Sequence, residues 1–343
     1  MPLIFSPHMV FRGQTLGKYR IVEPLGSGGF GTVYLAEDTW IDKRVALKVP
    51  HRQNLDFGEL LKEPRLLAAL GHPNIVTVIT AEKQDNVFFI VMEYVPGETL
   101  ETLIVHKGAL ELMQALDYTA QICNAVEHAH KHNILHRDLR PANVFVTEKG
   151  LVKVGDFGTS RVLELAAHGT TVIGSPPYMA PEQFEGRAVF ASDLYSIGVT
   201  MYQMLTGTLP YDTPAPADLV RLKRGELVTP PRERNSSIPK VIDDIVMRAL
   251  SPDVGTRYQR AEEMLNDLLA ARRDLVRKPP PQVATPPAPA GAGAASRPSP
   301  APRPAPTPTR LRPPGPPTAR FCWQCRKPLP ARGTRCPFCG EAQ

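Results

Sequence analysis

Long apolar runs are missing from this sequence of 343 residues. No stretch approaches the roughly 20 consecutive apolar residues that a transmembrane helix needs. The first residues, MPLIFSPHMVF, also lack the basic segment and the cleavage site of a secretory signal peptide. These absences predict a soluble protein without a membrane partner, and we expect it in the cytoplasm.

Cysteine is scarce before the C-terminal end: Cys123 stands alone there, and the other four of the five cysteines fall within the last 22 residues. A secreted framework of disulfides would distribute its cysteines through the fold. The observed distribution therefore favours a reducing compartment and a local metal site. Cys123 has an apolar-compatible position in a predicted helix, where we expect a small core residue.

The main part of the chain also lacks an excess of basic residues, although the whole sequence carries a net charge of +6. From Leu275 to the end there are 11 Lys and Arg against one Glu, whereas residues 1–274 hold 29 basic and 33 acidic residues. Nucleic acid is therefore not expected to bind the main domain and remains a candidate partner only for the basic tail.

Proline is abundant but unevenly placed: 16 of the 37 prolines fall in the 39 residues from Pro279 to Pro317. Such a stretch cannot bury a core and predicts a disordered linker, partly in the polyproline II conformation. The composition, 42% hydrophobic and 22% charged, is typical of a globular protein, so the core is expected before the linker.

Two kinds of pattern divide the region before the linker. Residues 19–92 hold five short runs rich in β-branched and aromatic residues (YRIVEPL, TVYLAE, RVALKV, IVTVIT and VFFIVME), with one helical pattern at 55–70. Helical periodicity then dominates, at 111–132, 191–207 and 240–250. A β-rich part followed by an α-helical part predicts an α+β fold of two lobes with a cleft between them.

A glycine-rich segment, Gly26-Ser27-Gly28-Gly29-Phe30-Gly31, lies between the first two strand-like runs. Glycines allow a backbone to approach phosphates and to donate amide hydrogens to them, although a tight turn alone also explains such a pattern. A dinucleotide-binding fold needs a helix directly after the last glycine. The run that follows here is strand-like, so that fold is not expected.

Charged and polar residues follow at positions that a phosphate site could use. Lys48 ends an apolar strand, and Glu63, 15 residues later, is its natural counter-ion; taken alone, Lys48 would be a surface lysine. Asn143 and Asp156 flank a strand-loop-strand stretch and can converge on Mg²⁺ bound to phosphates. Asp138 then remains to accept a proton from an attacking hydroxyl.

Together these motifs resemble those of the eukaryotic-like (bacterial Hanks-type) serine/threonine protein kinases, in order and in spacing, over residues 19 to about 271. The set comprises Gly26 to Gly31, Lys48, Glu63, His136-Arg137-Asp138, Asn143, Asp156-Phe157-Gly158, Ala180-Pro181-Glu182, Asp193 and Arg257. The resemblance implies a two-lobed protein kinase fold after an extension at 1–18. Its β-rich N-lobe would span 19–92, its hinge 93–97 and its α-helical C-lobe 98–273.

The resemblance also implies ATP and Mg²⁺ (or Mn²⁺) as cofactors. The residues that it marks as catalytic are Asp138, Lys48, Glu63, Arg140, Asn143 and Asp156, of which Asn143 and Asp156 would hold the metal. Met92 would lie at the back of the adenine pocket, with backbone bonds to the base from Glu93 to Val95. The residues implied in ATP binding are Leu25, Gly26, Ser27, Gly28, Gly29, Phe30, Gly31, Thr32, Val33, Ala46, Lys48, Met92, Glu93 and Val95.

Three further residues are structural by the same resemblance. Glu182 and Arg257 would form the buried ion pair that fastens the activation segment to the helical lobe. Asp193 would brace the catalytic loop from the start of a helix.

Two residues depart from the family's pattern. Arg140 stands where serine/threonine kinases usually have lysine; arginine keeps the charge near the transferred phosphate, and Pro141 after it favours serine/threonine over tyrosine specificity. Pro64 follows Glu63, and a proline inside a helix removes a hydrogen bond at a cost of ~3 kcal/mol or more. We therefore expect the helix to begin near Pro64, which would leave Glu63 near the cap and make the Lys48–Glu63 pair conditional.

The segment between Asp156 and Glu182 contains Thr170, Thr171 and Ser175. Thr170 and Thr171 are predicted autophosphorylation sites, because Arg137 is the kind of cation that pairs with a phosphothreonine in such a loop. Exposed threonines without this role are the alternative. Ser175 is expected to contact Asp138 within the substrate platform.

The stretch HAHKHNILH suggests a metal site at first sight, since His128 and His132 are four residues apart on a predicted helix. Alternate positions on a helix point in different directions, and His136 belongs to the catalytic motif. Packing or surface roles are therefore expected for these histidines.

Four cysteines, Cys322, Cys325, Cys336 and Cys339, form a CxxC-x10-CxxC pattern. Four thiolates in two knuckles suit tetrahedral Zn²⁺, and a module at 320–343 is too small to fold without a structural metal ion. We expect a small zinc ribbon on a linker at 274–319, with rubredoxin-like iron and a reversible dithiol as alternatives. The ribbon would bind a protein partner or regulate the kinase.

The predicted function is transfer of the ATP γ-phosphate to serine and threonine hydroxyls of protein substrates, with autophosphorylation of the activation loop. A pseudokinase scaffold, which would use the kinase fold and the ribbon for binding, is the alternative. The intact Lys48, Asp138, Asn143 and Asp156 argue against it, and only Pro64 and Arg140 argue for it. The activation segment disfavours a small-molecule phosphotransferase.

Overall fold

The computed structural model describes residues 10–28, 31–51, 53, 56–157, 175–212 and 218–277, with two short strands near the C-terminal end, and it leaves the side chain of Glu63 undescribed. The chain divides into two compact units, Met1–Gln282 and Val283–Gln343. The first unit contains both predicted lobes. The second contains the cysteine pattern.

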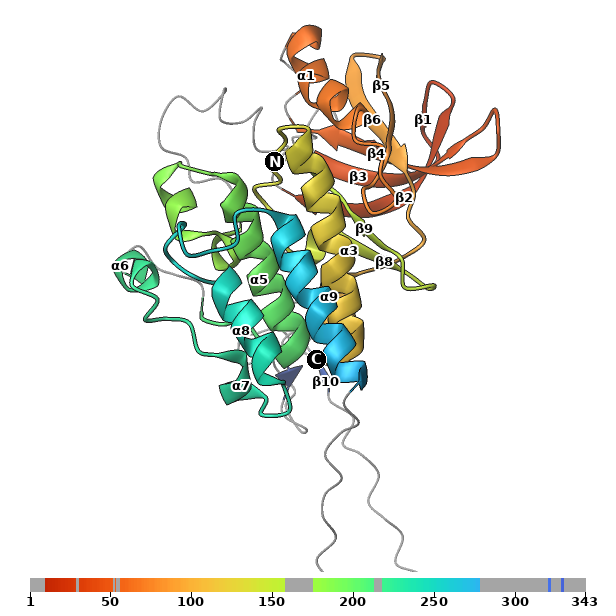
Figure 1. Ribbon diagram of the computed structural model, residues 1–343. Coiled ribbons are helices and arrows are strands. Elements are labelled where there is room, and N and C mark those ends of the chain that lie inside the picture. Colours follow the sequence, from red (N-terminus) through yellow and green to blue (C-terminus); the bar gives the residue numbers. More distant parts are fainter. Residues whose placement is uncertain are drawn as a thin grey trace, which may run out of the picture. The chain divides into compact units, whose positions relative to one another are not determined.

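A six-stranded antiparallel sheet forms most of the N-terminal lobe (Figure 1). Its strands are β1 (Thr15–Leu16), β2 (Tyr19–Gly28), β3 (Gly31–Asp38), β4 (Lys43–Pro50), β5 (Val78–Gln84) and β6 (Val87–Glu93), in the order β1-β2-β3-β4-β6-β5. Alternate residues of a strand point to opposite faces, so Val45, Leu47 and Val49 of β4 join one apolar cluster. Ala46 and Lys48 therefore point to the opposite face.

Helix α1 (Phe57–Ala68) contacts β5 of this sheet and begins well before Pro64. Asp56 caps it by accepting a hydrogen bond from the Gly58 backbone at 2.9 Å. The prediction that the helix begins near Pro64 is therefore wrong. Pro64 is buried inside the helix, where it cannot donate the bond that the carbonyl of Leu60 would otherwise receive. The N-cap at Asp56 and the burial of an apolar face outweigh this local cost.

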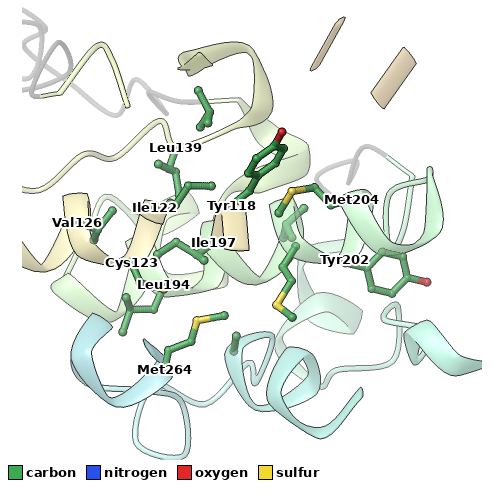
Figure 2. Packing of buried hydrophobic residues seen from close by; sticks show 14 of the residues in the cluster. Tyr118, Ile122, Cys123, Val126, Leu139, Leu194, Ile197, Tyr202, Met204 and Met264 are labelled. Carbon is green, nitrogen blue, oxygen red and sulfur yellow. The ribbon is translucent and has the colours of Figure 1, made fainter. Parts of the chain in front are cut away.

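The C-terminal lobe is built from helices. They are α2 (Leu100–Lys107), α3 (Leu112–Lys131), α5 (Phe190–Thr206), α6 (Leu219–Lys223), α7 (Pro231–Arg234), α8 (Lys240–Ala249) and α9 (Ala261–Arg277). Helix α3 packs against α5 and α9, and α5 packs against α8 (Figure 1). Side chains such as Ile122, Leu194 and Met264 fill the space between them (Figure 2). Cys123 is fully buried in this core, as the sequence predicted.

Short strands and short 3₁₀ helices complete the C-terminal lobe. Strands β7 (Gly97–Thr99), β8 (Val144–Thr147) and β9 (Val152–Val154) form a small antiparallel sheet in that order. The turns are η1 (Pro141–Asn143), η2 (Pro176–Tyr178) and η3 (Pro181–Glu185). Pro at the first position suits all three, because its missing N–H would be unpaired there anyway.

The two-lobed α+β architecture predicted from the sequence is thus confirmed for the first unit. Helix α9 continues to Arg277, past Arg273 where the sequence placed the end of the lobe. In the second unit, β10 (Arg320–Phe321) pairs antiparallel with β11 (Pro328–Leu329). Within the described ranges, none of the helices combines the length and the apolar character needed to cross a membrane.

Candidate active site

The carboxylate of Asp138 is held from several sides in the loop before η1. Its Oδ1 accepts a hydrogen bond from the backbone N–H of Ser175 at 2.9 Å. Its Oδ2 lies 3.3 Å from Asn143 Nδ2 and 3.7 Å from Arg140 Nε. Ser175 therefore contacts Asp138 as predicted, but through its backbone amide. A carboxylate oxygen beside a cation is suited to accept a proton from a neighbouring hydroxyl.

Asp193, in the first turn of α5, holds the backbone of this loop. Its Oδ2 accepts the N–H of His136 and its Oδ1 accepts the N–H of Arg137, both at 2.8 Å. Burial alone would raise the pKa of Asp193, but the imidazole of His130, the neighbouring His136 and the backbone N–H hold the pKa below its usual value. The buried carboxylate is therefore charged at neutral pH.

The backbone at Arg137 needs this support, because its φ of +68° lies in the left-handed region that a non-glycine residue seldom adopts. Such a conformation costs on the order of 1–3 kcal/mol and persists only where its surroundings fix it. The buried side chain of Leu139 anchors the other side of Asp138 in the helical core (Figure 2). Asp138 thus lies between Arg137, whose backbone Asp193 holds, and the buried Leu139.

Asn143 and Asp156 are brought together by the hairpin of β8 and β9. Val144 pairs with Val154, and the N–H of Gly155 donates to the carbonyl of Asn143 at 2.8 Å. Asn143 directly precedes β8 and Asp156 follows β9, so the two candidate metal ligands lie at the same end of this hairpin. Asn143 uses its amide nitrogen for Asp138, at 2.8 Å from the carbonyl, so its amide oxygen is the atom suited to Mg²⁺.

Lys48 reaches this region from β4, on the face of the sheet opposite the apolar cluster. Its Nζ lies 2.7 Å from Asp156 Oδ1, and the lysine is only 7% exposed. Burial alone would raise the pKa of Asp156, but the charge and hydrogen bond of Lys48 hold that pKa below its usual value. The sequence predicted Glu63 as the partner of Lys48; the side chain of Glu63 lies outside the description.

Side chains of neighbouring strands share the face that carries Lys48. Ala46 is paired with Met92 and Lys48 with both Val33 and Ile90 across the sheet. A cavity borders Lys48, Met92 and Asp156, and its remaining lining is mostly apolar: Leu67, Leu70, Ile75, Val76, Val78, Ile90, Gly155 and Phe157. Met92, the residue predicted at the back of the adenine pocket, thus lines the same cavity as Lys48 and Asp156.

The described part of the glycine-rich segment lies at the end of β2 and the start of β3. A Cβ added to Gly26 or Gly28 would meet no atom within 4 Å, so open space lies beside their backbone. At Gly31 the added Cβ would come within 2.4 Å of the carbonyl oxygen of Val49, so only glycine fits there. Phosphates could approach the first two glycines closely, which fits ATP.

The other predicted ATP contacts surround that turn and the end of β6. Leu25 is 46% exposed, and the hydroxyls of Ser27 and Thr32 lie 3.1 Å apart. Gly29 and Phe30 lie outside the described residues. Glu93 uses its carboxylate to bind Lys153 Nζ at 2.6 Å, a contact that the sequence did not suggest. A glutamate at position 93 does not by itself indicate which cation it binds. Val95 is half-buried in the segment after β6.

The end of the activation segment is fastened by Glu182 and Arg257. Arg257 is 1% exposed and donates to both carboxylate oxygens of Glu182, at 2.7 and 3.2 Å. Two further bonds run from its guanidinium to the carbonyls of Ser251 (2.9 Å) and Ala191 (3.0 Å). Thr170 and Thr171 lie outside the described residues.

The histidines of HAHKHNILH contact different partners. The rings of His128 and His132 lie 4.6 Å apart, and that of His128 stacks on His72 at 5.0 Å. Of the other two, His130 contacts Asp193 of α5, and the ring of His136 lies 4.6 Å from that of Phe157. No group of three metal-binding side chains of the His, Cys, Asp or Glu type occurs among the residues that the structure describes.

The fold and the site define a protein kinase, and residues 19–269 match the family described as protein kinase domain. The chain belongs to this family. It is 37% identical over 270 residues to a probable serine/threonine-protein kinase of Clostridium perfringens, covering 76% of this chain and 39% of that protein. It is 36% identical over 263 residues to the serine/threonine-protein kinase PrkC of Bacillus subtilis, covering 74% of this chain and 40% of PrkC.

A solved structure supports the same assignment. The crystal structure of Rad53 1–466 in complex with AMP-PNP superposes with a TM-score of 0.64 at 28% sequence identity, covering 73% of this chain and 64% of that one. The chain spans only about two fifths of the two bacterial relatives, 39% and 40% of their lengths. The similarity to them therefore concerns the kinase domain.

Proposed function

We propose that this protein is a serine/threonine protein kinase that transfers the γ-phosphate of ATP to hydroxyl groups of proteins, with Mg²⁺ or Mn²⁺. The observation that carries the proposal is that Lys48 contacts Asp156 and that Asn143 contacts Asp138, with Asn143 also joined to Gly155 by a backbone hydrogen bond. The bacterial relatives named above are serine/threonine-protein kinases, which supports the acceptor class. Protein substrates with serine or threonine acceptors are the expected partners.

Phosphoryl transfer requires mainly positioning and positive charge, and bound Mg-ATP supplies the phosphoryl group with part of that charge. In this chain Lys48 would grip the α- and β-phosphates, while Asn143 and Asp156 would hold the metal. Asp138 would orient the acceptor hydroxyl and take its proton at Oδ2. Such general-base assistance is worth about 10²–10⁴-fold in rate.

Arg140 would supply the cation beside the transferred phosphate. Its Nε lies 3.7 Å from Asp138 Oδ2 and has no hydrogen-bond partner among the described residues. The whole side chain of Arg140 is about one third exposed, at 34%, and its terminal nitrogens would face a substrate. Arginine in this position keeps the charge that the family's lysine provides.

The activation segment would be the first substrate. In the sequence, Thr170 and Thr171 come shortly before Ser175, whose backbone N–H is bonded to the carboxylate of Asp138. A phosphate there would add about two negative charges opposite Arg137 and would order the segment. Phosphorylation in this segment is therefore expected to raise activity.

The second unit would bind Zn²⁺ through Cys322, Cys325, Cys336 and Cys339. The pairing of Arg320–Phe321 with Pro328–Leu329 supports this, because the sequence between these two strands contains Cys322 and Cys325. Zinc knuckles use such short connections. The ribbon would then recruit a protein partner, at the end of a proline-rich tether.

The function is tested by autophosphorylation with Mg-ATP and mass-spectrometric mapping of the sites. The variants are Asp138→Ala and Lys48→Met, with Lys149→Met at an exposed position as the matched control. Phosphate on Thr170 or Thr171 in the wild type and in the control, lost in both site variants, is the expected result. Folded protein that binds nucleotide but carries no phosphate would instead support the pseudokinase scaffold.

Zinc is tested separately by elemental analysis of the purified full chain. One zinc per chain is expected, and its loss in Cys322→Ser and Cys339→Ser, but not in Cys123→Ser, would support the four-cysteine site. Iron in place of zinc, or no metal in the wild type, would contradict it.

A further inference from the structure

We propose that His72 makes the activity of this protein sensitive to acid. His72 lies in the loop between α1 and β5, where its ring stacks on that of His128 and its Nδ1 accepts a backbone hydrogen bond. Protonation of His72 breaks that bond and loosens the loop, which holds strand β9 and, through it, Asp156. This role rests on the kinase function proposed above.

Three histidine rings form a continuous stack between this loop and the C-terminal end of α3. The ring of His72 lies 5.0 Å from that of His128 at an interplanar angle of 30°, and the ring of His128 lies 4.6 Å from that of His132. His72 and His128 are half-buried, whereas His132 is exposed and donates from Nδ1 to the carbonyl of His128 at 2.8 Å. The stack therefore joins the loop after α1 to the helix that precedes the catalytic loop.

A backbone hydrogen bond fixes the neutral form of His72. Its Nδ1 accepts from the N–H of Asn74 at 3.1 Å, so this nitrogen carries no proton and the neutral ring holds its proton on Nε2. A second proton can bind only at Nδ1, and both nitrogens of an imidazolium are donors. Protonation therefore removes the acceptor of the Asn74 N–H and turns two donors toward each other.

The charges around the two half-buried rings oppose protonation. Among the described residues, the groups whose charge acts on these rings from the elements packed against them are histidines or cations: each other's imidazole, His132 and Lys131 at the end of α3, and Lys153 of β9. Burial lowers the pKa of His72 and of His128, and the neighbouring histidine and lysine charges lower each pKa further. Both rings are therefore neutral at pH 7.

The two carboxylates that bind these lysines do not reverse this effect. Glu93 contacts Lys153 at 2.6 Å, and Glu127 contacts Lys131 at 3.5 Å. Within the part of the chain that the structure describes, neither carboxylate forms an ion pair with His72 or His128. A proton on the stack thus has no anion to compensate it.

The lowered pKa sets the direction of the pH dependence. Because the folded pKa lies below the unfolded value of about 6.5, the neutral rings contribute fully to stability above that value. This contribution is lost as the pH falls through the folded pKa. Acid therefore weakens the contact between the loop and α3, and it does so in a range close to neutral pH.

The loop that His72 begins is also the one that holds β9. The side-chain nitrogen of Asn74 donates to the carbonyl of Val152 at 2.8 Å, and the carbonyl of Asn74 accepts from the N–H of Val154 at 2.8 Å. Asp156 follows Val154 by two residues. A shift of Asn74 therefore moves the carboxylate proposed to hold the metal, and a misplacement of about 1 Å can cost about 100-fold in rate.

A packing role alone makes a different prediction, because packing does not titrate. Asn offers an acceptor, Oδ1, the same number of bonds from Cβ as Nδ1 of His, and it carries no proton to gain. His72→Asn therefore keeps the bond from the Asn74 N–H at every pH. His72→Leu removes the acceptor at every pH and should resemble the acid form of the wild type.

The test measures both variants in the full chain from pH 7.5 to pH 5.5. The control is His106→Asn, since His106 on α2 has a side chain that is 70% exposed and lies outside the stack. The kcat on a peptide acceptor at saturating Mg-ATP is expressed relative to wild type at the same pH, so that titration of ATP and of shared groups cancels. Protection of the Val154 amide against hydrogen exchange is measured in parallel, relative to the intrinsic exchange rate at each pH.

We expect the kcat of His72→Asn to lie within about twofold of wild type at pH 7.5 and about fivefold above it at pH 5.5. His72→Leu should be about fivefold below wild type at pH 7.5 and should approach it at pH 5.5. A ratio of His72→Asn to wild type that does not change with pH would overturn the proposal, as would an equal gain in His106→Asn. Should His72→Leu fail to fold, the comparison of His72→Asn with wild type decides alone.

An inactive wild type would refute the kinase function instead. Protection of the Val154 amide would then still decide the role of His72. It should fall in the wild type below about pH 6.5 and stay constant in His72→Asn. Equal protection in both proteins at pH 5.5 would overturn the proposal, so the two failures are distinguishable.

Discussion

Lys48 Nζ lies 2.7 Å from Asp156 Oδ1, although 108 positions separate the two residues in the sequence. Strand β4 carries the lysine and the loop after β9 carries the aspartate, so this bond joins the two lobes directly. Each charge compensates the other in a place where an isolated charge would be costly. The pair therefore contributes to folding as well as to the proposed chemistry.

Loss of the cation should change how stability depends on pH. The pKa of Asp156 is lowered in the folded protein, so its contribution is present above the unfolded value of about 3.9 and is lost as pH falls through the lower folded value. We expect Lys48→Met to be less stable than wild type at pH 7. The difference in the free energy of unfolding should shrink below about pH 4, measured by urea unfolding.

Lys149→Met is the control for that series, because Lys149 is exposed. It should follow the wild type at every pH. A difference between Lys48→Met and wild type that stays constant from pH 7 to pH 3 would contradict the assignment of the effect to Asp156.

Arg257 should be among the most sensitive positions of the helical lobe. Arg257→Ala leaves the carboxylate of Glu182 buried without its cation, and breaking a buried pair in this way costs about 3–5 kcal/mol. Arg187→Ala removes the exposed partner of Glu185 and should cost far less, because exposed ion pairs contribute little to stability. Urea unfolding of both variants checks the contrast, and equal losses would show that burial does not decide it.

The sequence predicted those relationships that depend on local spacing. Asn143 and Asp156 were expected to converge because a strand-loop-strand stretch separates them, and the β8–β9 hairpin joins their ends. The start of α1 was predicted wrongly, because the rule for Pro64 is local whereas the N-cap at Asp56 and burial of the helix oppose it. At α1, capping and burial stabilise the helix by more than the internal proline destabilises it.

The contact of His130 with Asp193 could not be predicted in the same way. The two residues are 63 positions apart, and only the packing of α3 on α5 brings them together. Helical periodicity placed His128 and His132 on one face of the helix and His130 on another. It did not show which of these directions faced another helix.

Replacement of Pro64 should stabilise the protein. In Pro64→Ala the new N–H can donate to the carbonyl of Leu60, which removes part of a penalty of ~3 kcal/mol for an internal proline. Lost contacts of the buried ring offset some of this gain, so a net increase of about 1–2 kcal/mol in unfolding free energy is expected. Pro231→Ala, at the first position of α7, is the control and should bring no gain. A loss in Pro64→Ala would show that the ring packing dominates.

The charge of Arg140 should matter more than its shape. Its Nε lies 3.7 Å from Asp138 Oδ2, and in the proposed reaction its terminal nitrogens face the transferred phosphate. Arg140→Lys keeps a cation that can reach the same place, so kcat should stay within about threefold of wild type. Arg140→Gln keeps much of the length without the charge and should lower kcat about 10–100-fold, with the KM of ATP changed less. Steady-state kinetics on a peptide acceptor measure both values. If Arg140→Gln retained full kcat, the cation at this position would have no part in transfer, and Lys48 with the metal would supply the charge alone.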